Sequence, residues 1–176
     1  MAEPPSWGWH ALDRRWAELL VAEAGIAPGT LVVDVGAGTG AVTGPLLEVG
    51  ARVIAVEAHP GRAAALRRRF GRRIVVVQAD AADLRLPRHG YRVVANPPFA
   101  VTSPLLRRLL QPGTKLAGAD LILQDQAARR WAGSGAPGSA RWDRLFTVSL
   151  GRPLPKTAFR PPPHTKTRVL HIRSRL

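Results

Sequence analysis

The sequence LVVDVGAGTG, residues 31–40, decides the fold. It begins with an apolar run that ends on a carboxylate, Asp34, and three glycines then follow at alternate positions: Gly36, Gly38 and Gly40. A short apolar run bounded by glycines is typical of a buried parallel strand, and glycines let the backbone turn sharply and approach a ligand closely. Since residues 41–49 suit a helix, the stretch predicts a strand, a glycine turn and a helix N-terminus, which together form a nucleotide-type pocket.

Two classes of cofactor use such a turn. Gly36, Gly38 and Ala41 match the dinucleotide pattern G-x-G-x-x-G/A, so an NAD-dependent oxidoreductase is one interpretation. Asp34 favours the other, because a carboxylate two residues before the first glycine would repel a pyrophosphate but can hold the ammonium group of a methionine moiety. The pattern D-x-G-x-G-x-G resembles the S-adenosylmethionine loop of class I methyltransferases. We therefore expect S-adenosyl-L-methionine as the cofactor.

Length and composition limit the class of protein. With 176 residues and a hydrophobic content of 45%, the chain suits one domain, residues 1–176, of which residues 1–11 are expected to be a loose N-terminal segment. The chain has no apolar run long enough for a membrane span and no secretory signal at its start, so we expect a monomeric, cytoplasmic protein. The lack of cysteine excludes disulfides, thiol catalysis and cysteine-based zinc sites, and no metal site is predicted.

Charge is the strongest global feature of the chain. Lys and Arg number 26 against 12 Asp and Glu, which gives a net charge of +14. An excess this large favours a polyanionic partner, above all nucleic acid. The alternative is a solvated surface encoded by a GC-rich genome, which explains the use of arginine but not the net excess. The densest cluster comprises Arg62, Arg67, Arg68, Arg69, Arg72 and Arg73. These arginines either contact phosphates or form a solvated helix face, and the sequence does not decide between the two roles.

Two further acids follow predicted strands. The strand expected at 52–56 ends at Glu57, where a carboxylate can accept hydrogen bonds from both ribose hydroxyls of an adenosine. The strand expected at 74–78 is followed by Asp80, which can accept a hydrogen bond from an adenine amino group. For Glu57, a capping or surface role is the alternative.

The strand expected at 91–95 ends in a second informative stretch, Asn96-Pro97-Pro98-Phe99. Its prolines fix the backbone and remove amide donors, so that the side-chain oxygen of Asn96 and the carbonyl of Pro97 can point at one spot. Phe99 offers an aromatic face beside that spot. A planar exocyclic amine on a ring would fit such a site, whereas the alternative is a proline-stiffened turn with a buried Phe.

In this order and spacing, the glycine pattern, Glu57, Asp80 and N-P-P-F resemble the adenine-N6 methyltransferases of ribosomal RNA, and more closely the erythromycin-resistance type that modifies 23S rRNA. Residues 9–13 stand where that family has a Gln-Asn-Phe-Leu-type segment, and residues 159–163 resemble its F-x-P-x-P segment. The resemblance spans nearly the whole chain. It implies an α/β, Rossmann-like class I methyltransferase fold, with a seven-stranded, mostly parallel sheet flanked by helices.

The resemblance also implies two sets of site residues. The set that would bind the cofactor comprises His10, Leu12, Asp34, Gly36, Gly38, Glu57, Asp80, Ala81 and Asn96. The set that would carry methyl transfer comprises Asn96, Pro97 and Phe99. In this scheme Asn96 lies between the cofactor and the target amine, and Phe99 stacks on the target base.

The chain departs from the family pattern at three places. His10 replaces the usual Asn, and His-Thr-Lys-Thr at 164–167 stands where Val-Asp-Ser is common. The chain ends at Leu176, just after the last predicted strand, whereas typical members carry a further helical domain, so we expect a short form. The implied activity is methyl transfer to N6 of an adenine in 23S rRNA, with ribosomal RNA as the partner and macrolide-type resistance as the outcome.

Alternatives to this function stay open. N-P-P-F also occurs in DNA adenine and in protein glutamine methyltransferases, because both present a planar, amide-like nitrogen. A non-catalytic RNA-binding protein on the same fold is a further hypothesis, beside the oxidoreductase.

The remaining elements are expected from periodicity and glycine or proline breaks. Helices are expected from Leu12 to about Gly25, at 60–70, at 104–110 and at 124–131, and strands at 119–124, 145–150 and 168–173. Residues 132–140, rich in glycine and serine, predict either a flexible linker or a loop ordered by substrate.

Overall fold

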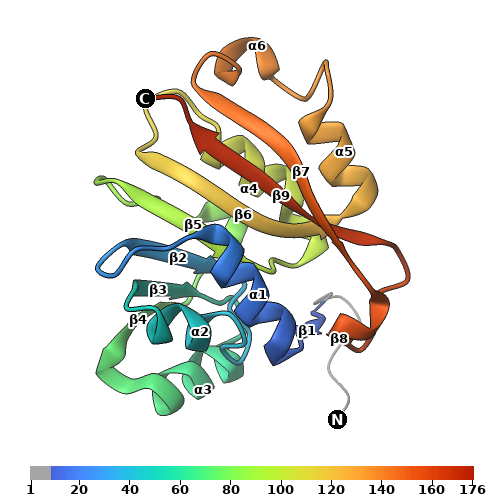
Figure 1. Ribbon diagram of the computed structural model, residues 1–176. Coiled ribbons are helices and arrows are strands. Elements are labelled where there is room, and N and C mark those ends of the chain that lie inside the picture. Colours follow the sequence, from blue (N-terminus) through green and yellow to red (C-terminus); the bar gives the residue numbers. More distant parts are fainter. Residues whose placement is uncertain (1–8) are drawn as a thin grey trace.

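The computed structural model of the protein describes residues 9–176, and its main feature is one seven-stranded sheet (Figure 1). The strands lie in the order β4-β3-β2-β5-β6-β9-β7. Their bounds are β2 Leu31–Val35, β3 Arg52–Val56, β4 Ile74–Val77, β5 Tyr91–Ala95, β6 Leu116–Gln124, β7 Phe146–Leu154 and β9 Thr167–Ser174. The predicted sheet is confirmed, although β6 and β7 are longer than their expected ranges.

All strands of this sheet except β9 run in the same direction. β2 pairs in parallel with β3 and β5, whereas β9 lies antiparallel to both β6 and β7. The strand order therefore reverses between β2 and β5, and the carboxyl ends of these two strands form the topological switch point at which open α/β sheets bind ligands. Both motifs singled out in the sequence follow these strands.

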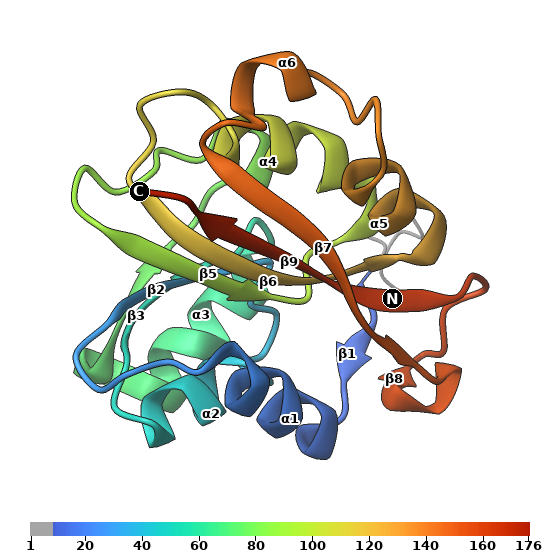
Figure 2. The ribbon, with the colours of Figure 1, turned by 45° about the horizontal axis from the view of Figure 1, so that its top comes forward.

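Helices cover both faces of the sheet (Figure 2). Their bounds are α1 Arg14–Ala24, α2 Thr43–Glu48, α3 Pro60–Phe70, α4 Thr102–Leu109, α5 Asp125–Ala132 and α6 Ser139–Trp142. Side chains alternate along each strand, so Val32 packs in the core with α1, α2 and α3, whereas Val33 packs in the core with α4, α5 and α6. Burial on both faces explains why the central strands are nearly continuous apolar runs.

A second sheet of two short strands joins the N-terminal segment to the chain beyond β7. β1, Ala11–Leu12, pairs antiparallel with β8, Phe159–Arg160. Leu12 and Phe159 lie opposite each other and are both buried. The expectation of a loose segment at 1–11 is therefore wrong for Ala11, and residues 1–8 lie outside the described part of the chain.

Helix α1 begins two residues later than expected. Leu12 is in β1, and Asp13 caps the helix because its carboxylate accepts a hydrogen bond from the amide of Arg15 at 3.0 Å. The left-handed conformation of Gly25, with φ of 61°, ends α1 where the sequence predicted.

In the glycine-rich segment 132–140, Ala136 is buried in the core and the other residues are half-buried or exposed, so the linker and the substrate-ordered loop both stay predictions. Ala136 and Trp142 are buried, and the indole Nε1 of Trp142 donates a hydrogen bond to the carbonyl of Pro137 at 3.1 Å. Trp142, just beyond the segment, anchors it through α6. Among residues 9–176, no helix is long and apolar enough to cross a membrane.

Candidate functional site

The glycine turn after β2 packs directly against the segment after β5. Gly36 has φ of 72° and donates its amide to the carbonyl of Val56 at 2.8 Å. A Cβ placed on Gly36 would lie 2.5 Å from Cδ of Pro98 and 3.3 Å from Cα of Pro97. Only a glycine permits this approach, so the two sequence motifs meet at the switch point of the sheet.

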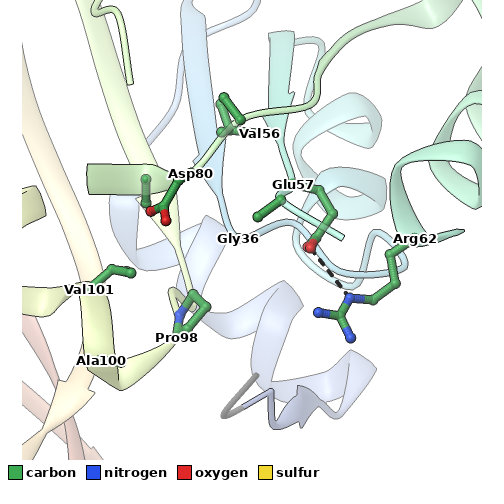
Figure 3. Close-up of a pocket in the computed structure, with 11 residues that line it drawn as sticks. Gly36, Val56, Glu57, Arg62, Asp80, Pro98, Ala100 and Val101 are labelled. Atoms are coloured by element: carbon green, nitrogen blue, oxygen red, sulfur yellow. Dashed lines mark hydrogen bonds and ion pairs between the residues drawn. The ribbon is translucent and has the colours of Figure 1, made fainter. Parts of the chain in front are cut away.

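A cavity of about 320 Å³ opens beside this contact (Figure 3). Four of the predicted site residues line it: Gly36, Glu57, Asp80 and Ala81. Figure 3 shows Glu57 with Arg62 on one side of the cavity and Asp80 with Pro98 on the other. Small apolar residues complete the walls, among them Ala58, Ala79 and Ala100. A mostly apolar pocket with a few carboxylates suits a flat ligand that carries hydroxyl and amino donors.

Glu57 is buried at the carboxyl end of β3, and both of its carboxylate oxygens accept hydrogen bonds from the backbone. Oε2 accepts the amide of Gly38 at 2.8 Å, and Oε1 accepts the amide of His59 at 2.9 Å. Oε1 also accepts a hydrogen bond from Nε of Arg62 at 3.4 Å, so Oε2 is the oxygen that keeps a further lone pair for a ligand hydroxyl. Glu57 therefore fixes the glycine turn to the start of α3 while its carboxylate remains at the cavity wall.

Asp80 lies at the exposed rim of the cavity. Its Oδ1 accepts the amide of Ala82 at 2.9 Å and so caps a short 3₁₀ turn, Ala81–Asp83. No other described residue bonds to the Asp80 carboxylate, so Oδ2 is available to a donor in the cavity.

Asp34 lines a second, small pocket together with Leu12, Gly36 and Asn96. Asp34 is only 1% exposed, and its Oδ2 accepts the hydroxyl of Thr43 at 2.7 Å. Burial raises the pKa of Asp34 to about 7, although the Thr43 hydrogen bond acts in the opposite direction. The pocket thus brings predicted residues for the methionine end of the cofactor next to the predicted catalytic Asn96.

His10 connects the N-terminal segment to the N-P-P-F segment and to the chain just after β8. Nδ2 of Asn96 donates to the carbonyl of His10 at 2.8 Å, which engages the amide nitrogen and leaves Oδ1 as an acceptor. The ring of His10 lies 2.7 Å, through Nδ1, from the carbonyl of Pro161, and its centroid is 5.5 Å from that of Phe99. His10 was predicted to bind the cofactor, but it lines neither of these two pockets. It contacts Asn96 and Phe99 from the N-terminal segment instead.

Comparison with known proteins gives the family. The family model described as "Ribosomal RNA adenine dimethylase" matches residues 12–175. The chain belongs to this family. An rRNA adenine N-6-methyltransferase from Corynebacterium diphtheriae is 37% identical over 145 residues, which cover 81% of this chain and 57% of that protein. A probable ribosomal RNA small subunit methyltransferase A from Pyrobaculum islandicum is 31% identical over 177 residues, which cover 92% of this chain and 73% of that protein.

The fold is shared with solved structures of the same kind. The crystal structure of the 23S rRNA methyltransferase ErmE superposes with a TM-score of 0.79 at 25% identity, over 93% of this chain and 68% of that one. The class I methyltransferase fold predicted from the sequence is therefore confirmed. The chain spans only about three fifths of the length of the Corynebacterium relative, whose match covers 57% of that protein.

Membership of the rRNA adenine dimethylase family implies S-adenosyl-L-methionine as the methyl donor, and the lining of the larger pocket fits its adenosine part. This pocket offers carboxylates near the ends of β3 and β4 to an adenosine, and the smaller pocket beside it, of about 20 Å³, has the buried Asp34 in its wall and room only for a group the size of an ammonium ion. The individual roles of these residues stay predictions.

Two residues at this site were not predicted from the sequence. The indole of Trp9 lies against Gly38 so closely that a Cβ there would overlap it, and the guanidinium carbon of Arg62 lies 4.9 Å from the centroid of the Trp9 ring. Arg62 is only 8% exposed and pairs with Glu57 at 3.4 Å, so a solvated face is wrong for this arginine. An acid at a strand end followed five residues later by an arginine in the first helical turn was the available signal.

Replacing Gly36 with alanine is expected to destabilise the fold more than replacing Gly29. Gly29 also has a positive φ, 81°, but nothing lies within 4 Å of an added Cβ there, so Gly29→Ala costs only the backbone strain of about 1–2 kcal/mol. Gly36→Ala adds an overlap with Pro98, worth roughly 1–3 kcal/mol more. Urea unfolding of both variants measures the difference, and equal losses would contradict the close packing of the two motifs.

Proposed function

We propose that the chain transfers a methyl group from S-adenosyl-L-methionine to N6 of an adenine in 23S rRNA, with macrolide-type resistance as the biological outcome. The contact between the glycine turn and N-P-P-F carries this proposal, because it sets the Asp34 pocket beside Asn96, where a donor and a base amine can meet. The net charge of +14 supports an RNA partner, since lysine and arginine contacts to phosphates provide most of the non-specific affinity for nucleic acids.

The relatives leave the choice of ribosomal RNA to experiment. ErmE is named a 23S rRNA methyltransferase, whereas the Pyrobaculum relative is named for the small subunit. We favour 23S rRNA because the sequence pattern resembles the erythromycin-resistance type more closely.

The side chains of this site would act mainly by positioning and by accepting hydrogen bonds. S-Adenosyl-L-methionine supplies an electrophilic methyl group on a sulfonium. The lone pair on adenine N6 is delocalised into the ring, so hydrogen bonds from N6–H to Oδ1 of Asn96 and to the carbonyl of Pro97 would favour a more tetrahedral nitrogen. The same acceptors would stabilise the positive charge that develops on N6. Phe99 would hold the extruded base, which stacking stabilises by about 1–3 kcal/mol.

The proposal is tested by incubating the protein with tritiated cofactor and, separately, 23S rRNA, small-subunit rRNA, adenine-containing duplex DNA and a glutamine-containing peptide. Label in 23S rRNA, mapped to one adenine by reverse-transcription stops, is the expected result. If label enters only the small-subunit RNA, the DNA or the peptide, that molecule is the substrate and the proposal of 23S rRNA is contradicted. Expression in a macrolide-sensitive host tests whether resistance results.

Replacing Asp80 with alanine is expected to weaken cofactor binding by about tenfold, because the adenine amino group loses a charged acceptor. Titration calorimetry measures this loss. Asp83→Ala is the matched control, since Asp83 is an exposed acid in the same 3₁₀ turn and does not line the cavity. Equal cofactor affinities of the two variants would show that Asp80 does not bind the adenine of the cofactor.

A further inference from the structure

A cavity of about 520 Å³, distinct from the cofactor cavity and from the small Asp34 pocket, lies at the same edge of the sheet as the methyl-transfer site. We call it the second cavity. Its walls come from the end of β6, from α5, from the first turn of α4 and from the loop before β9. The two cavities share a wall: Ala100 and Val101 line the cofactor cavity, and Ser103 lines the second one. The short segment from Phe99 to Ser103 therefore contributes to both cavities, and it begins at Phe99, the residue proposed to stack on the target base.

The charge in this second cavity is positive. Its only carboxylate is Asp125, which is paired with Arg129 at 2.8 Å and with Arg168 at 2.6 Å. These two guanidinium groups hold the pKa of Asp125 below its ordinary value, so it is ionised and already neutralised. Arg130 and Lys166 also line the cavity, and no side chain among residues 9–176 pairs with either cation. Two cations are thus left for an anionic ligand.

Amide side chains lie beside these cations. Nε2 of Gln124 donates to the hydroxyl of Thr165 at 3.1 Å, which fixes the amide and leaves its oxygen as an acceptor. Gln126 is exposed at the cavity and has no side-chain partner within the described chain. A pair of free cations next to two amides matches the chemistry of a nucleotide, whose phosphate is anionic and whose base edge carries donors and acceptors.

We propose that this cavity binds the RNA nucleotide next to the target adenine, with its phosphate on Arg130 and Lys166 and its base edge on Gln124 and Gln126. The proposal rests on the proposed function, and it adds a subsite that selects the sequence around the methylated adenine. A base extruded at Phe99 leaves its neighbour in the strand within reach of the other side of the Phe99–Ser103 wall. The amides then discriminate between bases at that position.

The first test is RNA affinity without cofactor, measured by fluorescence anisotropy on synthetic RNA hairpins with one loop adenine. The double variant Arg130→Ala/Lys166→Ala is expected to bind about tenfold more weakly and to reduce the slope of log affinity against log salt by about 1. Arg141→Ala is the matched control, because Arg141 is an exposed arginine on α6 that lines no cavity described here. Unchanged cofactor affinity in calorimetry shows that the double variant is folded.

The second test is base selection. Hairpins that differ only in the nucleotides flanking the loop adenine are compared as binding partners, and the ratio of best to worst affinity is measured for each protein. Gln126→Ala is expected to lower this ratio about tenfold, whereas Arg141→Ala leaves it unchanged.

Three outcomes overturn the subsite. They are RNA affinity of the double variant equal to that of Arg141→Ala, an unchanged base ratio in Gln126→Ala, and no hairpin binding by the parent. Hairpin binding with the expected losses, but without methyl transfer to any RNA, would instead support the subsite and contradict the proposed function.

Discussion

Replacing Asn96 with alanine is expected to reduce methyl transfer by at least about 100-fold, which is the usual loss when one preorganised group at a reacting centre is removed. The variant loses the acceptor next to the target amine. Cofactor affinity is expected to change only a few-fold, because Asp34, Glu57 and Asp80 remain in place. Tritium transfer to rRNA and calorimetry with the cofactor measure the two effects separately.

Asn96 also holds the N-terminal segment, and a second variant separates this role from catalysis. Asn96→Asp keeps acceptor oxygens but cannot donate to the carbonyl of His10 as the native amide does at 2.8 Å. Higher activity in Asn96→Asp than in Asn96→Ala would assign the loss to the acceptor. Gln111→Ala, an exposed amide in the turn after α4, is the surface control and is expected to retain parental activity. Full activity of Asn96→Ala would contradict the proposed site.

The elements that position the site could be predicted because their signals are local. β3, α3 and β5 have the predicted bounds, since each is an apolar run or a helical repeat closed by glycine, proline or a charged residue. The glycine pattern and N-P-P-F were each predicted at the end of a strand, and the structure places these two strands, β2 and β5, side by side. The resemblance to a known family supplied the roles that spacing alone does not give.

The features that were missed depend on contacts between distant parts of the chain. β1 and β8 have two residues each, and they form only because residues 11–12 meet residues 159–160. Asp120 is a further example: it is fully buried in β6, and its partners are Arg92 on β5 and His171 and Arg173 on β9. Burial alone would raise the pKa of Asp120, yet hydrogen bonds from His171 and Arg173 hold it below its ordinary value. The partners of Asp120 can be predicted only when the order of the strands is known, and the sequence pattern does not give that order.

Replacing Asp34 with asparagine is expected to stabilise the fold near neutral pH and to weaken cofactor binding. Burial raises the pKa of Asp34 from an ordinary 3.8 to about 7, so the folded state retains a proton that the unfolded state releases between these values. The stability that this proton provides is complete below about pH 4 and is lost as the pH rises through about 7. Above that pH the buried charge costs on the order of 4 kcal/mol, which the neutral amide avoids while still accepting the Thr43 hydroxyl. Thermal unfolding at about pH 8 measures the gain, and a lower melting temperature for Asp34→Asn would contradict it.

The same carboxylate gives cofactor binding its expected pH dependence. If Asp34 pairs with the ammonium group of the methionine moiety, it must be ionised in the complex, so the parent loses affinity about tenfold per pH unit below its pKa of about 7. Asp34→Asn is expected to bind the cofactor at least about tenfold more weakly at pH 8 and to show no such decline. 5′-Methylthioadenosine, which lacks the amino-acid group, is the matched ligand and is expected to bind both proteins equally at every pH. A decline with this ligand too would assign the titration to another group. Equal cofactor affinity of parent and Asp34→Asn would mean that the acid which distinguishes this glycine turn from a dinucleotide-binding turn does not hold the ammonium group.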